Sequence, residues 1–151
     1  MIIVHSYGLP EDSDTLQCYL GLQNTTADVQ QRLIIMQTAV ERAYEVSEYK
    51  DDDSTLKIFL APEFYFRGLN GAFSFQTEAE SEEVQEEGVC NDICQILRGL
   101  ERIVADERFE HWLFLFGTVI ASETLATEES SEFDYQFYNF APLYKGYNPT
   151  T

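Results

Sequence analysis

Residues 56–68 read Leu-Lys-Ile-Phe-Leu-Ala-Pro-Glu-Phe-Tyr-Phe-Arg-Gly, and the fold prediction starts from this stretch. The apolar run 58–60 is typical of a buried strand, and Pro62 ends it because proline has no N–H for a central ladder. Glu63 follows directly and precedes an aromatic run, so we expect its carboxylate to be partly desolvated, a condition that suits a general base. The alternative is that Pro62 and Glu63 open a surface turn, with the carboxylate in water. Glu63 is the catalytic candidate of the chain.

The composition limits the classes of partner. The chain has 151 residues, a length that suits one domain with a sizeable core. Its formal net charge of -18 repels phosphate backbones and anionic membranes, so we expect no nucleic-acid and no membrane partner. No apolar run approaches the ~18 residues of a membrane-spanning helix. Cys18, Cys90 and Cys94 lack the spacing of a disulfide framework, which favours a reducing compartment and a soluble, cytoplasmic protein.

Two segments have the apolar periodicity of amphipathic helices. The first follows the capping oxygens of residues 24–26 and is predicted to run to about Ser47, with Arg32 on its solvent side. The second is predicted from Ile93 to about Asp106. The apolar positions that predict the core-facing sides are Val29, Leu33, Met36, Val40 and Ala43 in the first helix, and Ile93, Leu97, Leu100 and Val104 in the second.

Three further segments are predicted to be strands. Residues 1–7 are short and β-branched. The continuously apolar segment 111–121 predicts one strand buried on both faces, with a bend or close backbone approach at Gly117. Residues 135–144 are aromatic, and Pro142 implies an edge or irregular position. The order β-α-β-α-β-β predicts a layered α/β domain, whose last two strands can pair as a hairpin.

Several motifs that bind metals or nucleotides are incomplete. The aspartates at 51–53 lack the alternating ligands and closing glutamate of an EF-hand loop. Cys90 and Cys94 are one helical turn apart but have no further cysteine or histidine nearby, and His5 stands alone in its strand. The glycines of residues 68–75 lack the spacing of a phosphate-binding loop. We therefore expect no metal and no cofactor.

Four separate motifs follow one another as in a known family. Ala61-Pro62-Glu63-Phe64, with Gly68 a few residues on, resembles the catalytic-glutamate motif of the carbon–nitrogen hydrolase (nitrilase) superfamily. An Asp that starts the first helix, a strand with a glycine, and a Tyr-Asn-x-Ala strand also resemble the family in their order. These features are Asp28, Phe116-Gly117-Thr118 and Tyr138-Asn139-Phe140-Ala141. The resemblance covers most of this chain, but only about the N-terminal half of a family catalytic domain.

The resemblance implies a fold and a reaction. Residues 1–151 would be a partial domain, about half of a nitrilase-like α-β-β-α sandwich, with an exposed sheet face that associates with a partner or forms a homo-oligomer. In the family a Glu is the general base, a Lys stabilises the tetrahedral intermediate, and a Cys attacks a small amide or nitrile to give a thioester that water hydrolyses. Glu63 matches the first role. Lys145 and the three cysteines do not match the positions of the other two, so this fragment is expected to be inactive alone.

Two other functions remain as alternatives. One is a non-catalytic acidic binding module that docks a partner by strand addition along the aromatic residues 135–144. The other is a metal-dependent hydrolase that uses Glu63 with loop aspartates, although no carboxylate spacing supports it. The sequence therefore leaves an enzyme and a binding module as competing interpretations.

Overall fold

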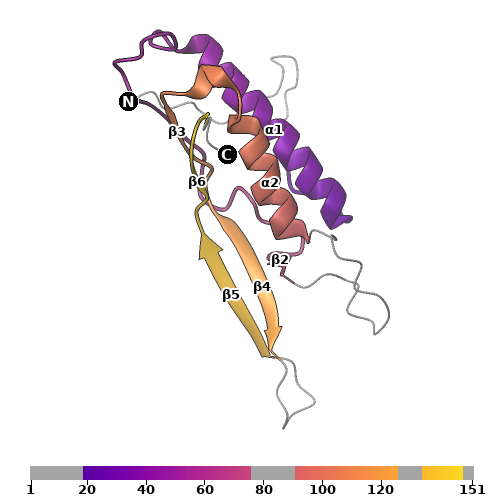
Figure 1. Cartoon of the computed structure of the whole chain (residues 1–151). Coiled ribbons are helices and arrows are strands. Elements are labelled where there is room, and N and C mark those ends of the chain that lie inside the picture. The colour runs from indigo at the N-terminus through magenta and orange to yellow at the C-terminus, as the bar shows by residue number, and fades with distance from the viewer. Residues whose placement is uncertain (1–18, 76–90, 126–133, 148–151) are drawn as a thin grey trace, which may run out of the picture.

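The computed structural model describes residues 19–75, 91–125 and 134–147 (Figure 1). The predicted strand 1–7, with His5, and the cysteines Cys18 and Cys90 lie outside these residues. The described elements make a mixed α/β fold, which confirms the predicted class, but their strands form two small sheets that the sequence did not predict. In chain order they are α1 (Thr25–Val46), β1 (Lys57–Leu60), β2 (Phe73–Ser74), α2 (Asp92–Val104), the short 3-10 helix η1 (Glu107–Phe109), β3 (Trp112–Leu115), β4 (Val119–Leu125), β5 (Asp134–Phe140) and β6 (Leu143–Lys145).

The two predicted helices are confirmed, and they pack against each other. The side chain of Asn24 caps α1 by accepting a first-turn N–H at 2.8 Å, and Asn91 caps α2 in the same way at 2.8 Å. The helices approach closely at Gly99, where a Cβ would lie 2.4 Å from Leu33 Cδ1. Figure 1 shows α1 and α2 side by side on one side of the strands. Their apolar faces and the inner faces of the strands form one core.

The strands form two three-stranded sheets that share one bent ribbon. The first sheet has the order β1-β3-β6 and the second β2-β4-β5. β1 and β2 run parallel to β3 and β4, whereas β6 and β5 run antiparallel to them. Since β3 leads into β4 and β5 leads into β6, these four strands form one antiparallel ribbon that passes from the first sheet to the second. The predicted hairpin is confirmed, because β4 and β5 pair from Val119 with Phe140 to Leu125 with Asp134.

Two predicted strands are each divided in the structure. The segment 111–121 is β3 and β4, separated at Gly117, and the segment 135–144 is β5 and β6, separated at Pro142. Gly117 has a φ of +74°, outside the extended region, and proline cannot donate to a ladder. The segment 111–121 is also not buried on both faces, because alternate residues of β3 are only half-buried. An unbroken apolar run carries no local signal that the chain changes sheet.

One face of both sheets is turned away from the helices and lies open. In β1, Phe59 packs in the core but Ile58 is 55% exposed, so the prediction of a strand buried throughout is wrong. Side chains alternate along a strand, and the helices cover only one face. On the same side of the ribbon, Phe137 is 67% exposed. We call this surface the outer face, and its exposed apolar residues are Ile58, Leu60, Tyr135, Phe137 and Leu143.

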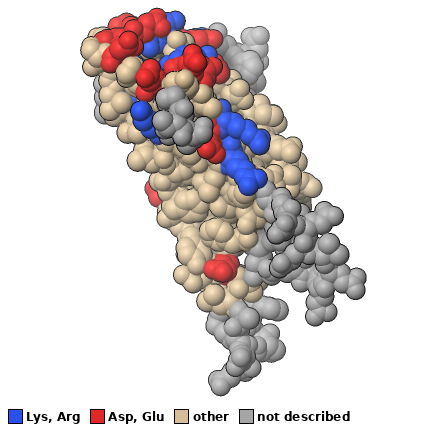
Figure 2. Space-filling view, in the orientation of Figure 1, with Lys and Arg blue, Asp and Glu red and all other residues tan. Residues whose placement is uncertain are grey.

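Acidic residues gather at the end of the molecule where α1 finishes. Two ion pairs lie there: Asp53 Oδ1, in the loop after α1, is 3.6 Å from His111 Nε2, and Arg108 of η1 pairs with Glu41 of α1. Figure 2 shows acidic groups clustered at this end and few over β4 and β5 in the same view. We call this region the acidic end, and its described carboxylates are Glu48, Asp51, Asp52, Asp53, Asp106, Glu107 and Glu110.

Candidate functional site

The three strands of the first sheet end or begin side by side, at the position where the ribbon bends. Pro62 follows β1, Gly117 follows β3, and Pro142 precedes β6. Pairing resumes beyond the bend, since Phe66 N donates to Thr118 O at 3.1 Å. Residues 62–65 therefore cross the bend between two paired stretches, and we call them the bend segment.

Glu63 lies in the bend segment with an exposed side chain. The expected partial desolvation is not found in the described structure, because Phe64 is 52% exposed and Phe66 is buried in the core. The outer face beside Glu63 is open, so its aromatic neighbours do not cover it. Glu63 Oε1 accepts a hydrogen bond from Asn139 Nδ2 at 3.4 Å. Two of the motifs, 76 residues apart in the chain, thus meet at the outer face.

Gly117 brings a third motif against the bend segment. A Cβ at this position would lie 2.1 Å from Pro62 O, so only glycine permits the approach. This confirms the close backbone approach predicted there. The next residue, Thr118, accepts the N–H of Phe64 with its Oγ1 at 2.7 Å. Phe64 has a φ of 60°, a strained value for an aromatic residue, and this hydrogen bond helps to hold it.

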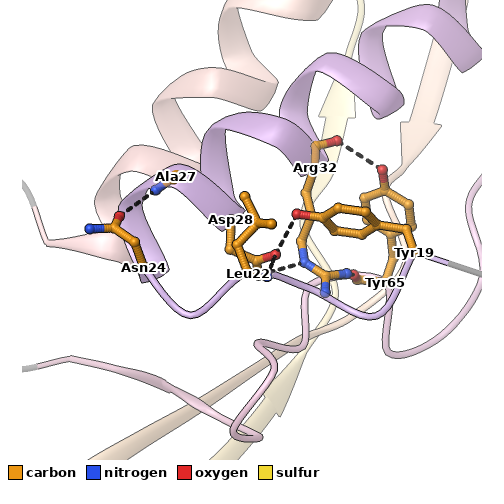
Figure 3. A network of polar contacts seen from close by, with 7 residues as sticks. All are labelled: Tyr19, Leu22, Asn24, Ala27, Asp28, Arg32 and Tyr65. Atoms are coloured by element: carbon orange, nitrogen blue, oxygen red, sulfur yellow. Dashed lines mark hydrogen bonds and ion pairs between the residues drawn. The ribbon is translucent and has the colours of Figure 1, made fainter.

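A buried ion pair supports the bend segment from the helix side (Figure 3). Asp28 is fully buried and accepts from Arg32 Nε at 2.8 Å and from Tyr19 Oη at 2.6 Å. Arg32 Nη1 donates to Tyr65 O at 2.7 Å, and Tyr65 Oη donates to Arg32 O at 2.8 Å. Charge-assisted hydrogen bonds of this kind are stronger than neutral ones. The fourth motif residue, Asp28, is therefore connected to the bend segment through Arg32.

The prediction that Arg32 faces solvent is wrong, because this side chain is only 7% exposed. Its partner Tyr65 lies 33 residues away, and no local pattern gives such a contact. One sequence signal was present: Asp28 and Arg32 have the i,i+4 spacing of a helical ion pair. Arg32 and Tyr65 are the site residues that sequence reasoning missed.

Two tyrosines of the network have raised pKa values. Burial, the hydrogen bond to Asp28 and the charge of that carboxylate raise the pKa of Tyr19 to about 12. Burial also raises the pKa of Tyr65. Both hydroxyl groups donate hydrogen bonds, Tyr19 to Asp28 and Tyr65 to Arg32 O.

Other reactive side chains are not brought to Glu63 in the described part of the chain. Lys145 is exposed on β6, and among the described residues no ion pair joins it to Glu63. Cys94 lies on α2 and is disulfide-bonded, contrary to the expectation from cysteine spacing. Within residues 19–75, 91–125 and 134–147, no group of three or more His, Cys, Asp or Glu residues is placed to hold a metal ion.

No protein-family model matches the chain, and neither the curated proteins nor the solved structures gave a match. Neither α1 nor α2, the long helices of the described part, combines the length and apolar character that crossing a membrane requires. The site is thus defined by its own geometry: an exposed carboxylate and an amide on the outer face, held by a buried network behind them.

Proposed function

We propose that this chain is the N-terminal portion of a nitrilase-like hydrolase, in which Glu63 acts as the general base. The substrate is a small molecule with a non-peptide C–N bond, an amide or a nitrile. The chain supplies the glutamate of a Glu-Lys-Cys mechanism, and the lysine and cysteine come from residues beyond it. As this fragment alone, it is inactive.

The convergence of four motifs on the bend segment supports the proposal. Glu63 meets Asn139 at 3.4 Å, Gly117 lies against Pro62 O, and Asp28 is linked to Tyr65 through Arg32. These positions were selected from their order along the sequence and not from any contact.

The proposed reaction uses Glu63 twice. For an amide, Glu63 takes the thiol proton, the thiolate adds to the carbonyl carbon, and the lysine stabilises the oxyanion. The C–N bond then breaks, and the amine leaves with the proton held by Glu63. Water next attacks the thioester, giving its proton through Glu63 to the leaving thiolate. Acid and free thiol are the products.

The exposure of Glu63 also fits a partial domain. A general base works better when partly desolvated, and the side chain lies at the edge of an open apolar face. We propose that the remainder of the domain covers this outer face as the second sheet of an α-β-β-α sandwich. Covering the face would remove water from Glu63 and place the lysine and cysteine opposite it.

The test is a variant of the protein extended through the reading frame downstream of residue 151. Glu63→Gln should lower the rate of ammonia release from amides by a factor on the order of 10²–10⁴, the usual contribution of a general base. Its melting temperature should be nearly unchanged, because the exposed side chain makes one long hydrogen bond. Glu48→Gln at the acidic end is the matched control, with the same charge change and an exposed side chain.

Two results would remove the hydrolase proposal. The first is wild-type turnover in Glu63→Gln. The second is a continuing reading frame that supplies no lysine and no cysteine at a turn between a strand and a helix. Residues 1–151 alone should release no ammonia from the same amides, because the nucleophile is missing.

A second candidate is a binding module that uses the aromatic strand β5. Among the described residues, β5 pairs only with β4 and lies at the edge of its sheet, with Tyr135 and Phe137 exposed. Edge strands with such side chains can accept a partner strand. Residues 1–151 alone would then bind a partner, whereas the hydrolase proposal requires the extended protein for activity.

A further inference from the structure

A hollow lies on the other side of the bend segment, near the start of α1. It has a volume of about 380 Å³, within the range of small-molecule sites. Figure 3 shows two of its lining residues, Tyr19 and Arg32. The guanidinium carbon of Arg32 lies 5.0 Å from the centroid of the Tyr19 ring. Glu63 does not line it, so the hollow is separate from the outer-face site. The lining side chains are Tyr19, Leu20, Arg32, Phe64, Arg67 and Leu69.

Among the described residues, one positive charge of the hollow has no ion-pair partner. Arg32 is neutralised by Asp28, with Nε and Oδ2 2.8 Å apart. Arg67 is exposed, and no carboxylate of the described residues forms an ion pair with it. The chain has three times as many acidic as basic residues, 27 against 9. Because Arg67 lines the hollow and no described carboxylate pairs with it, its guanidinium is available to an anion.

Three of the lining side chains are apolar and exposed, beside the polar surface that Tyr19 and the two arginines contribute. Leu20, Phe64 and Leu69 all present large apolar side chains to solvent. Phe64 is held there by a strained backbone, with its φ of 60° and its N–H bonded to Thr118 Oγ1. Backbone strain that keeps an aromatic ring in water costs free energy, and such strain recurs at ligand-binding positions. A ligand with an apolar body would cover these side chains.

We propose that this hollow binds a small organic carboxylate with an apolar body. The guanidinium of Arg67 holds the carboxylate through paired N–H donors, and the body lies against Phe64 and Leu69. The site needs neither Glu63 nor a cysteine, so it stands independently of the hydrolase proposal.

The charge count favours a monoanion. One free guanidinium balances one carboxylate, whereas a phosphate dianion would add a second negative charge to a chain of net charge -18. The Tyr19 hydroxyl already donates to Asp28 and stays protonated, so it repels no anion. Size also fits, because a ring with a short acidic side chain is small enough for the hollow.

Calorimetric titration of residues 1–151 with phenylacetate tests the site. Saturable binding is expected, with a Kd on the order of 1 mM for so small a ligand. Phenylacetamide, which has the same shape without the charge, should bind at least about tenfold more weakly. Arg67→Gln should weaken phenylacetate binding by at least about tenfold, since it removes the charged partner.

Arg98→Gln is the matched control. Arg98 is exposed on α2, away from the hollow, and its substitution removes the same positive charge. It should leave the Kd within about twofold of wild type. Phe64→Ala should weaken binding and leave the preference for the acid over the amide intact. Equal losses in Arg67→Gln and Arg98→Gln would overturn the site, as would equal binding of acid and amide. Tighter binding of phenyl phosphate, or no saturable binding up to about 10 mM, would overturn it as well.

Discussion

Asp28 accepts hydrogen bonds from Tyr19 Oη, Leu22 N and Arg32 Nε at the start of α1. Its side chain is 1% exposed and that of Arg32 is 8% exposed, so the pair is shielded from water on both sides. Because Arg32 also donates to Tyr65 O, the pair connects the helix to the bend segment. At the residue scale, this contact joins α1 to the segment that carries Glu63.

Asp28→Asn is therefore expected to destabilise the protein strongly. The substitution keeps the shape but leaves the charge of Arg32 buried and unpaired, which costs about 3–5 kcal/mol in other buried pairs. The free energy of unfolding, from urea titration of the single tryptophan fluorescence, measures the loss.

The matched control is the exposed ion pair between Arg42 and Glu45, whose side chains are 59% and 63% exposed. Glu45→Gln should change stability by less than about 1 kcal/mol, because solvent screens exposed pairs. If both substitutions cost the same, the buried network does not hold the bend segment.

At the scale of the elements, Gly117 fixes where β3 ends and β4 begins. Gly117→Ala should be severely destabilising, because the new Cβ would lie 2.1 Å from Pro62 O and the backbone there cannot move aside. We expect a loss greater than the about 1–2 kcal/mol that a left-handed conformation alone costs a residue with a Cβ. Thermal unfolding followed by circular dichroism measures it.

Gly71→Ala is the control that separates the cost of the backbone conformation from the cost of the steric contact. Gly71 also has a positive φ, +110°, but a Cβ there would meet nothing within 4 Å. Gly71→Ala should therefore show the conformational penalty alone. A smaller loss for Gly117→Ala than for Gly71→Ala would show that the approach to Pro62 does not constrain the bend.

The helices were predictable because their signals are local. Asn24 supplies the cap of α1, and residues such as Val29, Met36 and Val40 repeat at helical spacing and are buried as expected. The division of the apolar segment 111–121 was not predictable in full, since a strand that changes sheet keeps the same composition. Gly117 marked the position of the bend, but it did not indicate that the chain passes there from one sheet to the other.

The candidate site was predictable in part, for a similar reason. The order of the motifs selected Glu63 and Asn139, and the structure brings them together. Neither the exposure of Glu63 nor the burial of Arg32 followed from the sequence, because both depend on contacts between distant segments. A single carboxylate after a strand does not reveal which face of the sheet is covered.

At the scale of the whole molecule, the outer face presents several exposed apolar side chains from both sheets. Ile58 on this face and Ile34 on α1 are a matched pair, 55% and 57% exposed. We propose that residues 1–151 associate through the outer face. Ile58→Lys should then weaken self-association by at least about tenfold, whereas Ile34→Lys should not, although both add one positive charge.

Light scattering coupled to size-exclusion chromatography over a range of concentrations measures this association. A larger effect of Ile34→Lys would assign the interface to the helices. A wild-type chain that stays monomeric at the highest concentration would remove the outer face as a self-association surface.

When two copies pack outer face to outer face, the acidic end limits their relative orientation. Such a pair is isologous, so a two-fold axis in the plane of contact relates the copies. An axis along the strands would bring both acidic ends together, where like charges repel strongly at low salt. An axis across the strands places these ends far apart. The charge of the described residues therefore favours the antiparallel pair, in which the two acidic ends lie at opposite ends of the assembly.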